Sequence, residues 1–157
     1  MEFIIENRMA LAIMIPFIAG FLVLNLGKRV NQNIREGITI SAAILTMICV
    51  VTMAPQVLSG IEYKLSGFEI VEGIDFSIKT DSGGMVFACV SSILWCVTSV
   101  YSIGYMRGHG EKNQTGFYAA FAACIGAAMG ICFAANLFTF IIFYEILTIA
   151  TYPLVVH

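Results

Sequence analysis

The chain has 157 residues, of which 59% are hydrophobic and only 11% are charged, and its formal net charge is −2 at pH 7. Soluble domains carry about 25% charged residues, so this composition excludes an ordinary soluble core. Residues 9–27, 37–61 and 82–106 contain no Asp, Glu, Lys or Arg. Because about 18 such residues suffice to cross the hydrocarbon core of a bilayer, the chain is predicted to be an integral membrane protein.

The first two helices are predicted over residues 9–26 and 37–58. Pro16 falls inside the first helix, where a membrane protein tolerates proline because neighbouring groups can bond the freed carbonyl. The chain starts with acidic residues, whereas a cleaved signal peptide starts with positive charge. We therefore expect the first helix to be retained.

Between residues 61 and 79 the hydrophobic pattern changes from continuous to alternating. Apolar side chains alternate with polar ones in residues 61–65 and again in residues 74–79, with Gly67 and Gly73 between the two runs. This period of two predicts an amphipathic β-hairpin outside the hydrocarbon layer. Two interpretations stay open: the hairpin folds over the helix ends, or it forms a docking surface for a partner.

A third helix is predicted over residues 82–105, and the apolar stretch after it is too long for one span. A turn at Ala135-Asn136 divides that stretch into helices over residues 117–135 and 137–156. Each has about 20 residues, or roughly 30 Å at 1.5 Å per residue, which matches the hydrocarbon core. Asn136 is expected to cap the last helix, because its side chain can accept from free backbone amides. The predicted fold is an all-α membrane protein with five transmembrane helices and a short extramembrane hairpin.

Lysine and arginine set the expected orientation. The loop after the first helix carries Lys28, Arg29 and Arg35, the loop after the third carries Arg107 and Lys112, and the hairpin segment is mainly acidic. Loops rich in lysine and arginine stay in the cytoplasm. We therefore expect a multi-pass protein of the cell (plasma) membrane, with its N-terminus and hairpin outside and its C-terminus in the cytoplasm.

The fourth helix carries a ridge of small residues. Ala122, Gly126, Gly130 and Ala134 recur at every fourth position. Small residues at this spacing let two membrane helices approach closely. The ridge is predicted to be a helix-packing surface, and it points to no particular chemistry.

Glu145 is a carboxylate near the middle of the predicted helix 137–156. A charged side chain at the centre of a bilayer costs about 2.5–3.5 kcal/mol, so we expect Glu145 to face the bundle interior. Burial there favours the neutral acid, whereas a nearby cation favours the carboxylate. A group balanced between these effects can take up and release a proton, which predicts a buried proton relay. The alternative is that Glu145 is a packing residue that holds helices together.

Three neighbours of Glu145 fit a relay. Thr148 and Tyr152 follow it at i+3 and i+7 and so share its helix face. Their hydroxyls can hold water and pass protons, although such side chains often bond only the backbone. Pro153 cannot donate to the carbonyl of Ile149, which leaves a free acceptor one turn beyond the carboxylate.

Residues 134–155, with the sequence AANLFTFIIFYEILTIATYPLV, resemble a known signature. They are similar to the fifth transmembrane helix of the antiporter-like subunits shared by respiratory complex I, Mrp-type cation/proton antiporters and membrane-bound hydrogenases. Residues 101–106 (YSIGYM) and 78–84 (IKTDSGG) resemble the end of the third helix in that family and the entry to it. The resemblance covers essentially the whole chain, and the sequence is most similar to the Mrp D-type and hydrogenase versions of these subunits.

The resemblance implies that Glu145 belongs to a line of proton-translocating residues. Members of the family continue with further helices, whose lysines pair with this glutamate. The predicted spans of this chain contain no lysine, so it resembles the N-terminal third of such a protein. We expect another membrane subunit to supply the buried lysines.

Residues 1–157 are thus predicted to form one membrane domain of a proton or sodium/proton translocating subunit, in a redox-driven or antiporter complex. The competing hypothesis is a structural or assembly subunit in which Glu145 only packs. The sequence has no Gly-x-Gly-x-x-Gly motif and no cysteine cluster, so no cofactor or metal is expected and any redox chemistry would reside in partners. Expected partners are lipid and other membrane subunits, and no nucleic acid.

Overall fold

The computed structural model describes residues 2–27, 29–110 and 113–156, so Lys28, Lys112 and His157 lie outside the described residues. The described part forms five helices and one antiparallel hairpin. In chain order they are α1 (Glu2–Leu26), α2 (Gln32–Leu58), β1 (Lys64–Val71), β2 (Ile74–Lys79), α3 (Ser82–His109), α4 (Gln114–Cys132) and α5 (Leu137–Val156). All five helices of this part are long and apolar enough to cross a membrane. The predicted fold class is confirmed.

Several helices differ from the predicted ranges at their ends. α1 begins at Glu2, α2 begins at Gln32, and α3 continues to His109. A charge-free run marks the part of a helix that fits hydrocarbon, whereas the helix itself continues as long as its backbone bonds do. α4 ends at Cys132 because the chain leaves the helix there and Ala134 pairs with the hairpin.

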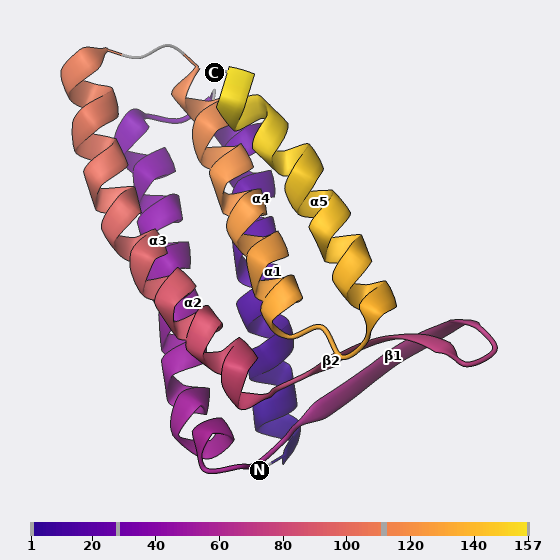
Figure 1. Cartoon of the computed structure of the whole chain (residues 1–157). Coiled ribbons are helices and arrows are strands. Elements are labelled where there is room, and N and C mark those ends of the chain that lie inside the picture. Colours follow the sequence, from indigo (N-terminus) through magenta and orange to yellow (C-terminus); the bar gives the residue numbers. More distant parts are fainter. Residues whose placement is uncertain (1, 28, 111–112, 157) are drawn as a thin grey trace.

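Successive helices run in opposite directions, as Figure 1 shows. The N-terminus and the hairpin lie at one end of the bundle, here called the hairpin end. The C-terminus and the α1–α2 and α3–α4 connections lie at the other end, here called the basic end because it carries Arg29 and Arg107. The expectation that the two basic connections share one side is therefore confirmed.

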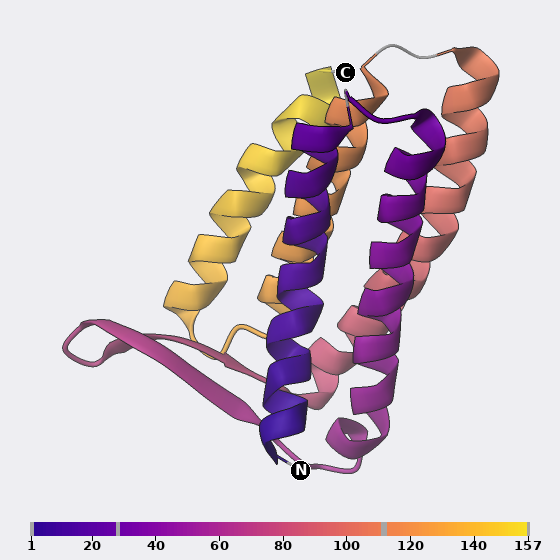
Figure 2. The same cartoon turned by 180° about the vertical axis from the view of Figure 1, so that it is seen from behind.

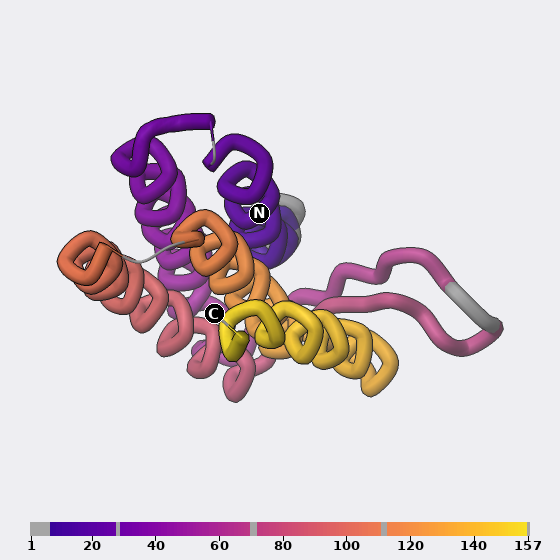
Figure 3. Tube along the Cα trace, turned by 90° about the horizontal axis from the view of Figure 1, so that it is seen from above, coloured from indigo at the N-terminus to yellow at the C-terminus, as the bar shows by residue number. Residues whose placement is uncertain are grey.

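α4 is the central helix and α5 is an edge helix. Seen from above in Figure 3, α4 lies among α1, α3 and α5, and it packs against all three. In their most apolar stretches, 56% of the α4 residues are buried, against 11% of those in α5. Most of the α5 surface therefore faces away from the described bundle.

The hairpin is attached to the bundle at its base and projects past α5 at its tip, as Figures 1 and 2 show from opposite sides. At the base, Leu65 pairs with Ile78, and Tyr63 and Ile78 join the bundle core. Farther out, Phe68 is 68% exposed. The base thus folds over the helix ends, as one of the two interpretations expected. Whether the tip forms a docking surface for a partner stays open.

The bundle interior changes character along its length. The hairpin end is filled by fully buried apolar side chains, among them Met9, Met53, Met85, Met129 and Phe133. Methionine suits such a junction because its flexible side chain fills irregular gaps. Toward the basic end, the helices that face each other bury polar and charged side chains instead.

Candidate functional site

Glu145 is the ninth of the 20 residues of α5 and its side chain is exposed. The packed face of α5 carries the buried residues Thr139 and Phe143. Two successive steps of a helix turn the chain by about 200°, so Glu145 points away from Phe143 and from α4. The prediction that Glu145 is buried in the interior of this bundle is therefore wrong for the part of the chain that the structure describes. Within that part, Glu145 has no hydrogen bond or ion pair.

The structure brings the predicted neighbours of Glu145 onto the same outward face. Thr148 and Tyr152 are both exposed, Tyr152 to 70%. The Thr148 hydroxyl donates to the carbonyl oxygen of Tyr144 at 3.0 Å, so its oxygen keeps acceptor capacity for a further group. Pro153 lies inside α5 near its end and is also exposed. Glu145 and two hydroxyls thus form one stripe, here called the α5 outer stripe.

The small residues of α4 contact two different helices. A Cβ added to Gly126 would lie 2.9 Å from the Phe17 ring of α1, and one added to Gly130 would overlap the Phe143 ring of α5. Ala122 is buried beside Gly20 of α1. Ala134 lies beyond the end of α4 and pairs with Ile78 of the hairpin. The predicted ridge therefore does not extend to Ala134, because the helix ends first.

The first turn of α5 is bonded to the hairpin. Asn136 accepts from the Thr139 amide at 2.8 Å, which caps α5 as expected, and donates to the Asp75 carbonyl at 2.6 Å. The Ser77 amide donates to the Thr139 hydroxyl at 3.1 Å, and the Ala135 amide donates to the Ser77 carbonyl at 3.0 Å. The helix that carries Glu145 is thus anchored by β2 at one end and by Phe143 along its packed face.

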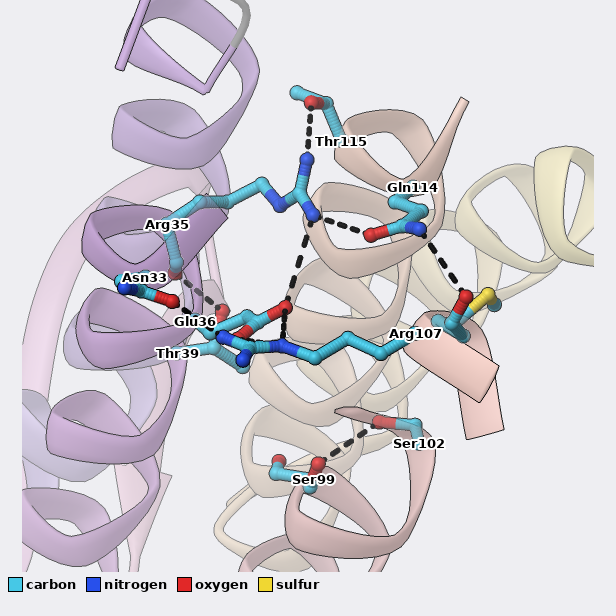
Figure 4. A network of polar contacts seen from close by, with 10 residues as sticks. Asn33, Arg35, Glu36, Thr39, Ser99, Ser102, Arg107, Gln114 and Thr115 are labelled. Atoms are coloured by element: carbon cyan, nitrogen blue, oxygen red, sulfur yellow. Dashed lines mark hydrogen bonds and ion pairs between the residues drawn. The ribbon is translucent and has the colours of Figure 1, made fainter. Parts of the chain in front are cut away.

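Sequence reasoning missed a second carboxylate, Glu36, which is only 3% exposed. It lies in the second turn of α2, opposite the last turns of α3 (Figure 4). Arg107 donates from Nε to the two oxygens of Glu36 at 3.2 and 3.0 Å and from Nη2 to the same carboxylate. The available signal was position: Glu36 directly precedes one charge-free run and Arg107 directly follows another.

Arg35 was assigned to a loop and instead lies buried in α2, 6% exposed. Its guanidinium donates to Thr115 Oγ1 at 3.3 Å and to Gln114 Oε1, lies 3.9 Å from Glu36 Oε1, and stands 5.5 Å from the centre of the Tyr118 ring. These contacts tie α2 to α4, as the Glu36 contacts tie α2 to α3. We call Arg35, Glu36 and Arg107 the charged cluster; its chemistry is that of a fixed ion-pair network.

No protein-family model matches the chain. It is 26% identical over 148 residues to NADH-quinone oxidoreductase subunit N of Desulforudis audaxviator (strain MP104C), across 92% of this chain and 29% of that protein. It is 22% identical over 155 residues to a probable K(+)/H(+) antiporter A/B subunit of Rhizobium meliloti (strain 1021), across 96% of this chain and 15% of that protein.

The fold is also found in a solved structure. A chain of the membrane-bound sulfane sulfur reductase, an archaeal respiratory membrane complex, superposes with a TM-score of 0.76 and 19% identity, over 92% of this chain and 22% of that chain. Our chain thus spans only a minor part of the length of each relative. The resemblance noted in residues 134–155 is confirmed: this multi-pass membrane protein is a partial homologue of NADH-quinone oxidoreductase subunit N and of the K(+)/H(+) antiporter A/B subunit.

Proposed function

We propose that this chain is part of a proton or cation/proton translocating membrane subunit, in which Glu145 takes up and releases a proton. One observation carries the proposal: a carboxylate stands at mid-helix depth on the outward face of a transmembrane helix. Left against lipid, it would cost about 2.5–3.5 kcal/mol, and such residues normally face a protein interior or a water-filled path. The two relatives are named as subunits of an oxidoreductase and of an antiporter, which supports ion translocation.

The α5 outer stripe is proposed to be covered by a further membrane helix that carries a buried lysine. Within the described residues, Arg35 and Arg107 contact Glu36 at the basic end. Arg8 is partly buried in α1, close to the hairpin end and beside Cys49 of α2. The charge that biases Glu145 must then come from elsewhere. A lysine close to Glu145 favours the carboxylate, and its withdrawal or neutralisation favours proton uptake. Thr148 and Tyr152 would hold waters along the same face.

The basic end is proposed to face the cytoplasm and the hairpin the outside, following the charge rule for membrane loops. The orientation can be tested by replacing Lys64 or Arg29 with a single cysteine in a chain that lacks the native cysteines. Each variant is then labelled in intact cells with a membrane-impermeant thiol reagent. We expect labelling at position 64 and none at position 29 until the membrane is opened. The reverse pattern would invert the orientation.

The relay itself is tested by replacing Glu145 in the complete membrane complex. Glu145→Gln keeps the size of the side chain and removes its exchangeable proton, so proton or cation transport by sealed vesicles should fall sharply while assembly is kept. Glu145→Asp should keep part of the activity, because the group still titrates. Tyr144→Phe, a neighbouring exposed change on α5, is the matched control and should transport normally. Normal transport by the glutamine variant would favour a packing role instead.

A further inference from the structure

Polar side chains continue the charged cluster into the middle of the bundle, between α2, α3 and α4. The members are Thr39, Thr46, Trp95, Ser99, Ser102 and Tyr118, and each is 5% exposed or less. Figure 4 shows Ser102 and Ser99 one below the other beneath Arg107. We call this set the polar column.

Two contacts fix the depth of the polar column. Glu36 meets Arg107 at the basic end, and Met47 meets Cys96 farther in, with sulfur atoms 3.9 Å apart. Glu36 and Met47 are as many residues apart on α2 as Cys96 and Arg107 are on α3. The two helices therefore keep one antiparallel register between these contacts. Thr46 therefore lies at a depth between Ser99 and Trp95, roughly 15 Å from Glu36 at a rise of 1.5 Å per residue. That is about half of a 30 Å hydrocarbon core.

Several atoms of the charged cluster and of the polar column lack a partner among the described protein groups. They are Arg35 Nε, Thr46 Oγ1, Ser99 Oγ and Trp95 Nε1, all fully enclosed. The Tyr118 hydroxyl faces Ser102 without reaching the geometry of a hydrogen bond. The only other such atom in the described residues, Gln56 Oε1, belongs to a partly buried side chain near the hairpin end. Buried polar groups are bonded in at least about 90% of cases, so this concentration along one line calls for a ligand.

The chemistry of these atoms selects the ligand. The N–H groups of Arg35 and Trp95 need an acceptor, whereas the hydroxyls can both donate and accept. A cation does not suit the N–H groups, and an anion does not suit the neighbouring carboxylate of Glu36. Water supplies both donors and acceptors, and buried waters usually serve polar groups of this kind. We propose that a chain of ordered waters fills the polar column from the charged cluster to Trp95.

Such a chain is a proton path separate from Glu145, and this consequence rests on the proposed ion-translocating function. Each water or hydroxyl oxygen accepts one proton and releases another, so nothing is consumed. The indole nitrogen of Trp95 has no free lone pair and cannot accept a proton. One turn beyond it the hydroxyl of the buried Ser92 donates to the Cys89 carbonyl oxygen at 2.9 Å, and past Ser92 lie the apolar side chains of the hairpin end. The column is thus a half-path, open toward the basic end and closed at the bundle centre.

Hydroxyl-radical footprinting of the intact complex tests for the waters, since radicals made by an X-ray pulse modify side chains that touch ordered water. Trp95 and Met85 form a matched pair. Both lie on α3 and both side chains react rapidly with hydroxyl radicals, and Trp95 is 1% exposed and Met85 0% exposed. The proposal predicts that Trp95 is modified several-fold faster than Met85. Equal, low modification of the two would overturn it.

A double variant, Thr46→Val with Ser99→Ala, adds a second readout. In a hydrated column it removes partners of the waters, so modification of Trp95 and the Tm should both fall while Met85 is unchanged. In a dry column it removes unpartnered hydroxyls, so the Tm should rise and the footprint stay the same. Glu145→Gln should keep the wild-type footprint, so failure of the relay and failure of this proposal are distinguishable. If the double variant does not assemble, the wild-type comparison of Trp95 with Met85 still decides.

Discussion

Glu36 and Glu145 are two carboxylates on apolar helices, and their surroundings differ in every respect. Glu36 is 3% exposed and is bonded by Arg107, with Arg35 close by. Glu145 is exposed and has no partner among the described residues. A charge that is neutralised inside its own bundle needs nothing further and holds helices together. A carboxylate presented outward on a membrane-spanning helix, with no partner among the described residues, is the better candidate for the proposed proton chemistry.

The largest expected difference is in folding stability. Glu36→Ala removes the counter-charge of the buried Arg35 and should destabilise the bundle by about 3–5 kcal/mol, the usual cost of breaking a buried pair. Glu145→Ala removes an exposed carboxylate that has no partner among the described residues, so it should not lower stability. Reversible unfolding in detergent micelles, followed by circular dichroism, measures both. Equal stability losses would mean that the two carboxylates are not distinguished in the way the structure indicates.

A smaller effect is expected at the contact that holds α5 against α4. A Cβ at Gly130 would overlap the Phe143 ring, so Gly130→Ala should cost about 1–3 kcal/mol through overpacking. Gly104→Ala in α3 is the control, because its Cβ would meet open space and alanine is the better helix former by up to about 1 kcal/mol. The same unfolding assay separates them. A neutral Gly130→Ala variant would show that α5 is held loosely and that the outward direction of Glu145 is not fixed.

The positions of the helices and of the hairpin along the chain were largely predictable from the sequence. Which side of each helix packs against its neighbours was not. Long apolar runs with few or no charges marked all five helices, and a period of two marked the hairpin, because each pattern reflects one local environment. α5 is apolar on nearly every side, so its sequence does not reveal which face packs; the Gly130–Phe143 contact decides that. The burial of Glu36 depends on the register between α2 and α3, which no local pattern contains. Asn136 was recognisable as a cap, but its bonds to Asp75 join segments far apart in sequence.

The most direct test of the proposed relay is whether Glu145 changes its protonation while the complete complex works. Infrared difference spectroscopy detects the carbonyl stretch of a protonated carboxylic acid, and subtraction of the Glu145→Gln spectrum assigns the band to this residue. We predict a band that appears or disappears on turnover in the wild type, is absent from Glu145→Gln, and persists in Glu36→Gln. A spectrum in which turnover changes no band assignable to Glu145 would contradict the relay.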